Sequence, residues 1–258
     1  MEPTTSGNNR SGAAAAADGV REMLTANERW APNQVPDTSL AEEERRLYIL
    51  DSDPVGSIPP PVTIPGMLKT GLQKMMGERP EMLMDKIGER IAFERGGTRL
   101  YDALIGKYRA LMQAEGAPAL PVPLDAGGAT VGDTLLRIRT EEHEHYQMLC
   151  EVMTSLGGDP TAVTPCADVI ATASLGLMQV VTDPRTTLAQ SLNAILTAEL
   201  TDNAGWELLI TLAEGAGHSD VADRFRAALA QEQQHLVTVR AWVEALATTS
   251  TTTKTAAV

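Results

Sequence analysis

The sequence predicts an all-α protein built around a bundle of four long helices. Along four segments of the chain, apolar residues recur at steps of three and four, which is the period of an amphipathic helix. Stretches rich in glycine and proline separate these segments. The connection between the second and third segments, residues 157–185, is longer than a hairpin needs, which indicates a crossover along the length of the bundle.

Composition divides the chain into three parts. Residues 1–66 form an N-terminal extension that is predicted to be flexible or partly ordered. It begins with a Ser-, Thr-, Gly- and Ala-rich stretch, contains the short amphipathic segment SLAEEERRLYIL and ends near the proline-rich IPPPVTIPG. Residues 67–247 are predicted to form the bundle, and residues 248–258 a disordered tail.

The first two bundle helices are predicted at residues 81–113 and 130–156. In the first helix a single glutamate, Glu94, falls within the apolar stripe, where an unpaired charge would be costly to bury. In the second helix, Glu142 and His145 lie in the stripe. The other acidic residues in the middle of this helix are predicted to face solvent: Glu141, Glu144 and Glu151.

The third and fourth bundle helices are predicted at residues 187–213 and 220–246. The apolar stripe of the third helix contains Glu199, and that of the fourth contains Glu232 and His235. Each of the four helices therefore carries one glutamate at the centre of an otherwise apolar face.

Two of the helices repeat the pattern Glu-x-x-His. A spacing of three residues puts the carboxylate and the imidazole on one face of a helix, where both can reach the same point. Together with the single glutamates of the other two helices, they form the ligand inventory of a dinuclear metal site inside a four-helix bundle. The predicted metal ligands are Glu94, Glu142, His145, Glu199, Glu232 and His235, with the four glutamates as the catalytic residues.

This ligand set suits two divalent transition-metal ions. Carboxylate oxygens and imidazole nitrogens bind Fe(II) and Mn(II), and four carboxylates are neutralised by two such ions, as a buried site requires. Two iron ions are the predicted cofactor, with manganese or a mixed pair left open. Tyr101 and Trp206 are predicted to be core residues whose polar atoms find partners, with a redox-active or supporting role beside the metals as the alternative. Asp202 and Asn203 either support the histidine ligands or lie on the helix surface.

Charge and composition exclude several functions. A net charge of −13 speaks against binding of nucleic acid. Cys150 and Cys166 are the only cysteines and form no CxxC pair, which excludes a structural zinc site and a rubredoxin module. No signal peptide and no run of eighteen apolar residues is evident, so the protein is predicted to be cytoplasmic, with no membrane partner.

The chain resembles the ferritin-like superfamily, and most closely its rubrerythrin-like bacterial members, in IAFERGGTRLYDAL, EEHEHYQML, LTAELTDNAGWELL and EQQHL. The resemblance implies a ferritin-like four-helix bundle with a long crossover between helices 2 and 3, without a rubredoxin module. It also implies that Glu142 and Glu232 bridge the metals and that Glu94 and Glu199 are terminal ligands, with one imidazole for each metal. A homodimer and a separate electron donor are further expectations.

Two functions are consistent with these features. The first is an oxidoreductase of the ferroxidase or peroxidase type, in which Fe(II) reacts with O2 or H2O2 in stress defence or iron handling. The alternative is a ferritin-like binding or structural protein that acts through its N-terminal arm, with a mainly structural metal site. Hydroxylation of a substrate would need a pocket beside the metals, and the continuous apolar stripes predict none.

Overall fold

The computed structural model of the chain is helical throughout its regular parts. It describes residues 16–31, 37–56, 80–116, 120–122 and 129–252. Within these ranges there are seven helices and no strand, so the predicted all-α class is confirmed. The chain divides into two compact units, Met1–Pro54 and Val55–Val258.

The first unit contains α1 (Ala17–Trp30) and α2 (Ser39–Asp51). The second of these helices coincides with the predicted amphipathic segment. No residue of either helix is buried, and large apolar side chains such as Trp30 and Ile49 are exposed. Single exposed apolar residues are common on protein surfaces. A partner-binding role for this arm therefore stays a hypothesis.

The second unit contains the predicted bundle. Four of its helices correspond to the four predicted ones: α4 (Pro80–Glu115), α5 (Val131–Ser155), α7 (Leu188–Gly215) and α8 (Ser219–Thr252). A further helix, α6 (Pro165–Thr182), lies in the predicted long connection. The sequence predicts this connection but not its helical structure.

Capping side chains determine where two of the bundle helices begin. Thr130 accepts a hydrogen bond from the backbone N–H of Asp133, and Asp133 accepts one from the N–H of Thr130. Thr187 and Gln190 make the same reciprocal pair at the start of α7. These capping boxes satisfy N–H groups of the first turn that have no partner within the helix.

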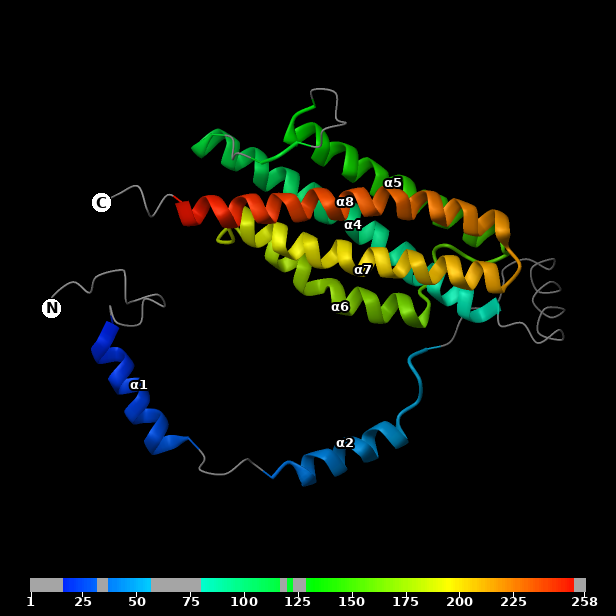
Figure 1. Cartoon of the computed structure of the whole chain (residues 1–258). Helices are drawn as coiled ribbons and strands as arrows, with labels where there is room; N and C mark the ends of the chain where they lie inside the picture. The colour runs from blue at the N-terminus through cyan, green and yellow to red at the C-terminus, as the bar shows by residue number, and fades with distance from the viewer. Residues whose placement is uncertain (1–15, 32–36, 57–79, 117–119, 123–128, 253–258) are drawn as a thin grey trace. The chain divides into compact units, whose positions relative to one another are not determined.

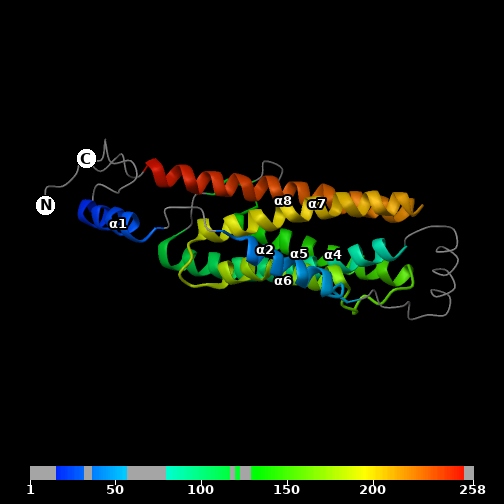
Figure 2. The same cartoon turned by 90° about the horizontal axis from the view of Figure 1, so that it is seen from below.

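The helix α4 contacts α5, α6 and α7, and α8 packs against α7 (Figure 1). Figure 2 shows the same grouping after a quarter turn, with α7 and α8 as one pair and the other three bundle helices beside it. The helices α4 and α5 are antiparallel. Arg139 of α5 pairs with Asp102, whereas Gly158, just beyond the end of α5, lies against Met84 near the start of α4.

The helix α6 returns the chain along α4. At its start, the N–H of Cys166 donates to the carboxylate of Asp85 at 2.9 Å, near the beginning of α4. After its end, the carbonyl of Asp183 accepts from Lys107 at 2.9 Å, toward the end of α4. Consequently α7 starts at the same end of the bundle as α5, and the two helices run in the same direction.

Among the described residues, α6 is also the one helix long and apolar enough to cross a membrane by length and composition alone. Its 18 residues have a mean hydropathy of 1.3, and Asp168 is its only charged residue. The expectation of no such run overlooked this helix because polar Thr, Ser and Gln interrupt it. One helix of this kind is a weak indication, and cytoplasmic localisation stays a prediction.

Two apolar clusters fill the bundle, one toward each end. In α5, for example, residues 131–138 contribute to the first cluster and residues 149–153 to the second. Burying a large apolar side chain contributes about 1.5–3 kcal/mol. The polar side chains of the predicted metal site lie between the two clusters and are shielded from solvent by both.

Candidate metal centre

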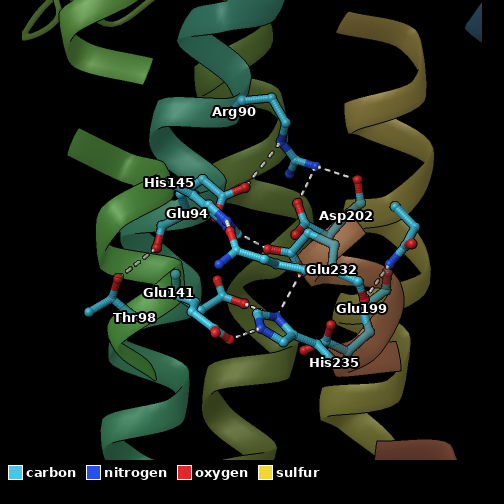
Figure 3. Close-up of polar contacts among 12 residues, drawn as sticks. Arg90, Glu94, Thr98, Glu141, His145, Glu199, Asp202, Glu232 and His235 are labelled. Atoms are coloured by element: carbon cyan, nitrogen blue, oxygen red, sulfur yellow. Dashed lines mark hydrogen bonds and ion pairs between the residues drawn. The ribbon is translucent and has the colours of Figure 1, made fainter. Parts of the chain in front are cut away.

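The structure brings all six predicted metal ligands together in the middle of the bundle. Figure 3 labels five of them: Glu94, His145, Glu199, Glu232 and His235. All six side chains are buried, although four of them are acidic. Three overlapping groups have oxygen or nitrogen atoms that lie within 4.8 Å of one another: Glu142, Glu199, Glu232 and His235; Glu94, His145 and Glu232; and Glu94, Glu142, Asp202 and Glu232.

The two groups that contain a histidine are two candidate metal positions. The first position has His235 as its imidazole ligand, and the second has His145. Glu232 belongs to all three groups and Glu142 to two of them. Both residues can therefore reach two ions, whereas Glu199 belongs only to the first position. This distribution agrees with the bridging and terminal roles implied by the family resemblance, which stay predictions.

Both histidines present the same nitrogen to the centre. The Nδ1 atom of His145 lies 2.6 Å from Glu232 Oε1, and that of His235 lies 3.0 Å from Glu232 Oε2. On the outer side, Nε2 of His145 donates to Gln231 at 2.9 Å and Nε2 of His235 donates to Glu141 at 2.7 Å. A donor role for Nε2 leaves Nδ1 unprotonated when a metal is bound, which fixes the tautomer that ligation requires.

The sequence interpretation missed the two outer partners. Glu141 is predicted to face solvent, and this prediction is wrong, because its side chain is partly buried and reaches across to α8. Gln231 is not among the residues that the sequence pattern singles out. Each of them directly precedes the glutamate of one Glu-x-x-His motif and binds the histidine of the other motif. The sequence pattern that could have predicted these partners is the longer repeat, in which Glu or Gln directly precedes Glu-x-x-His.

Replacing Glu141 by glutamine should weaken metal binding without unfolding the bundle. A neutral amide makes a weaker hydrogen bond to His235, so the imidazole becomes less basic and less firmly oriented. Loss of such an outer partner typically lowers metal affinity about 10- to 100-fold. Titration with Mn(II) by calorimetry measures this effect. The exposed Glu144 of the same helix supplies the control variant, Glu144→Gln, and equal affinities in both variants would contradict the assigned role.

Tyr101 and Asn203 support the carboxylate of α7. The hydroxyl of Tyr101 donates to Glu199, and the side-chain amide of Asn203 donates to the backbone carbonyls of Glu199 and Glu232 at 2.9 and 3.2 Å. Asn203 thereby ties α7 to α8 at the level of the site. Trp206 is fully buried, as predicted, and packs edge-on against His145 with 5.5 Å between ring centroids.

A buried ion pair borders the second metal position. The Nη1 atom of Arg90 lies 2.6 Å from Asp202 Oδ1, and its Nε lies 4.0 Å from Glu94 Oε1. Gly205 provides the space, since a Cβ there would lie 2.2 Å from the guanidinium. Neither role predicted for Asp202 is observed, because its side chain is buried and pairs with Arg90 rather than with a histidine. Arg90 offsets the charge of this fifth carboxylate, so the four glutamates carry the remaining negative charge of the centre.

The metal-free site holds protons that metal ions would displace. Burial raises the pKa of Glu94 and of Glu199 well above its ordinary value, and neighbouring carboxylates add to this effect. Burial disfavours protonation of the two histidines, but Glu232 outweighs it and raises the pKa of each. Burial likewise opposes ionisation of Glu232, yet His235 and His145 lower its pKa.

Several buried polar atoms of the centre lack a hydrogen bond among the described residues. They are both carboxylate oxygens of Glu94 and Oε2 of Glu199, together with Nδ1 of His145 and Oε1 of Glu232, which contact each other at 2.6 Å only as an ion pair. Leaving such atoms unpaired is costly, and native structures satisfy the great majority of them. Such a gathering of buried oxygen and nitrogen atoms fits a set of metal ligands.

No protein-family model, curated protein or solved structure matches the chain. Its chemistry is therefore inferred from its own residues.

Proposed function

We infer that the chain is a ferritin-like di-iron carboxylate protein whose metal centre oxidises Fe(II) with O2 or H2O2. The observation that carries this inference is the convergence of six buried ligand side chains from four helices on two adjoining positions. A pair of iron ions bound there supplies two-electron redox chemistry. A structural site for one ion needs fewer ligands than this set provides.

The direction of the helices supports the ferritin-like assignment. In such bundles a long crossover joins two helices that run in the same direction. The contacts of α6 with both ends of α4 give α5 and α7 this relation. The rubrerythrin-like character remains part of the proposal.

The protein's own residues control charge and water at this centre. The apolar clusters above and below exclude water, which strengthens electrostatic interactions between the carboxylates and bound cations. Tyr101 holds a proton at its hydroxyl, directed at Glu199, because burial and this carboxylate raise its pKa well above the ordinary value. On the opposite side, the Arg90–Asp202 pair adds no net charge.

Rapid mixing tests the proposed chemistry. We expect the Fe(II)-loaded protein to be oxidised by O2 or H2O2 much faster than free Fe(II) under the same conditions, as followed by stopped-flow absorbance. Glu199→Gln should slow this reaction, whereas the surface variant Glu144→Gln should leave it unchanged. If the protein-bound Fe(II) is oxidised no faster than free Fe(II), the proposed function is contradicted.

The electron supply and the assembly form the remaining parts of the proposal. The two cysteines offer no CxxC pair for an iron–sulfur site, so reducing equivalents would come from a separate donor. A homodimer in the cytoplasm is the proposed state of the protein.

A further inference from the structure

A pocket with a cavity volume of about 240 Å³ opens at the surface between α4 and α6. Its walls are mainly apolar and include Phe93, Leu100, Leu175 and Met178. The apolar stripes of the sequence predict no pocket beside the metals, and they do not reveal this one, which the backbone of α4 separates from the candidate ligands. The stripes describe how each helix faces the bundle core, whereas this space lies between α4 and the additional helix α6.

The inner wall of the pocket borders the metal centre. Gly97 lines the pocket, and a Cβ built on it would lie 2.1 Å from Oε2 of Glu142. No side chain fits at this position, so the backbone of Gly97 is what separates the pocket from that carboxylate. Ala198, which precedes Glu199 in α7, lines the same pocket. A molecule in the pocket would therefore touch the backbone that carries or borders two of the predicted ligands.

A second glycine keeps the pocket open. Gly96 also lines it, and a Cβ at this position would meet no atom within 4 Å. Glycine in the middle of a helix costs about 0.5–1 kcal/mol relative to alanine. No neighbouring atom requires a glycine at this position. The loss of helix stability caused by Gly96 therefore has no packing reason, and its effect is to leave the pocket open.

Two arginines give the pocket a cationic edge. Arg95 and Arg99 line it, both are exposed, and neither forms an ion pair with a described residue. The neighbouring Asp102 is paired with Arg139 instead. In a chain of net charge −13, two guanidinium groups that have no ion pair within the described part of the chain favour an anionic group at the edge of this apolar pocket.

We propose that this pocket binds a small amphipathic organic anion. Its apolar part lies against Gly96 and Gly97, and its carboxylate pairs with Arg95 and Arg99. Pockets for drug-sized ligands measure about 300–1,000 Å³, so the smaller volume here suits a short or medium-chain carboxylate. The site extends beyond the proposed redox function and does not depend on it, because none of these residues is a metal ligand.

Calorimetric titration of the metal-free, full-length protein with octanoate tests the proposal. We expect saturable binding of one octanoate per chain and weaker binding of octanol, which lacks the charge. Gly96→Leu should abolish binding because its side chain fills the pocket. Gly106→Leu is the matched control, since Gly106 lies in the same helix, is exposed and has no atom near its Cβ. This control should bind as the wild type does.

Two further variants make the outcome independent of any folding defect in Gly96→Leu. Ala171→Leu fills the pocket from α6 and should also abolish binding. The double variant Arg95→Gln/Arg99→Gln should weaken octanoate binding about tenfold, as expected for two partly exposed ion pairs, and leave octanol binding unchanged. Equal binding of octanoate and octanol, or binding that survives both pocket-filling variants, would overturn the proposal.

Failure of the two proposals can be told apart. Absence of octanoate binding with rapid Fe(II) oxidation would overturn the ligand pocket alone. Octanoate binding with no accelerated oxidation would overturn the redox function alone. If a second copy of the chain covers the pocket, octanoate will not bind, and Gly96→Leu will shift the molar mass measured by light scattering. That outcome also overturns the proposal.

Discussion

Replacing Glu232 by glutamine should abolish the binding of a metal pair. The carboxylate of Glu232 belongs to all three groups of ligand atoms and lies within 3.0 Å of both histidine Nδ1 atoms. Glutamine keeps the volume of the side chain but removes the charge that two cations share. We expect a loss of affinity of more than about 100-fold, beyond the range for outer partners of metal ligands.

Variants of Glu94 and Glu199 provide the comparison for Glu232→Gln. Glu199 belongs only to the group of ligand atoms that contains His235. Glu94 belongs to the group that contains His145 and to the group that contains Asp202. Each single glutamine variant at these positions should therefore keep one ion and lose the other. Metal content per chain, measured after anaerobic loading with Fe(II) and gel filtration, distinguishes these results. Two ions retained by Glu232→Gln would contradict its shared role.

The four bundle helices, and the burial of the six candidate ligands on their inner faces, were predictable from the sequence because both depend on the period of a single helix. A glutamate within an apolar stripe is visible without knowledge of the neighbouring helices. For Glu232 and His235, a spacing of three residues was sufficient to predict that they share a face.

The remaining features depend on how different helices approach one another. Glu141 lies at the edge of its helix face, and only the position of His235 on α8 makes it a partner. Arg90 requires both Asp202 on α7 and the space left by Gly205. The pocket beside Gly96 depends on α6, whose apolar sequence indicated a connection without revealing its helix or where it packs.

The metal-free bundle should lose stability as the pH rises. Glu94 and Glu199 have a raised pKa in the folded protein, so they stay protonated where the unfolded chain has released its carboxyl protons. His145 and His235 also have raised pKa values. The folded state then binds more protons than the unfolded state, and the free energy of unfolding falls with pH. This fall begins above pH 4.5 for the glutamates and above pH 6.5 for the histidines.

Thermal melts of the chelator-treated protein at pH 5.5 and 8.5 measure this dependence. Each extra proton held by the folded state contributes about 1.4 kcal/mol per pH unit. The double variant Glu94→Gln/Glu199→Gln removes two of these protons and should flatten the dependence, whereas Glu144→Gln should not. This comparison separates the buried site from the general repulsion of an acidic chain. A metal-free melting temperature that rises with pH would contradict the assignment of protons to the centre.

Metal ions should reverse the effect of pH on stability. Two divalent ions replace the protons and neutralise the carboxylates, so Mn(II), which is stable in air on this time scale, should stabilise the protein more at pH 8.5 than at pH 5.5. At a hundredfold excess over Kd, each site adds about 2.7 kcal/mol. For two sites in a chain of this size, this corresponds to an increase in melting temperature of about 10–20 °C. In Glu232→Gln the increase should disappear, because the stabilisation arises from the carboxylate that both ions share.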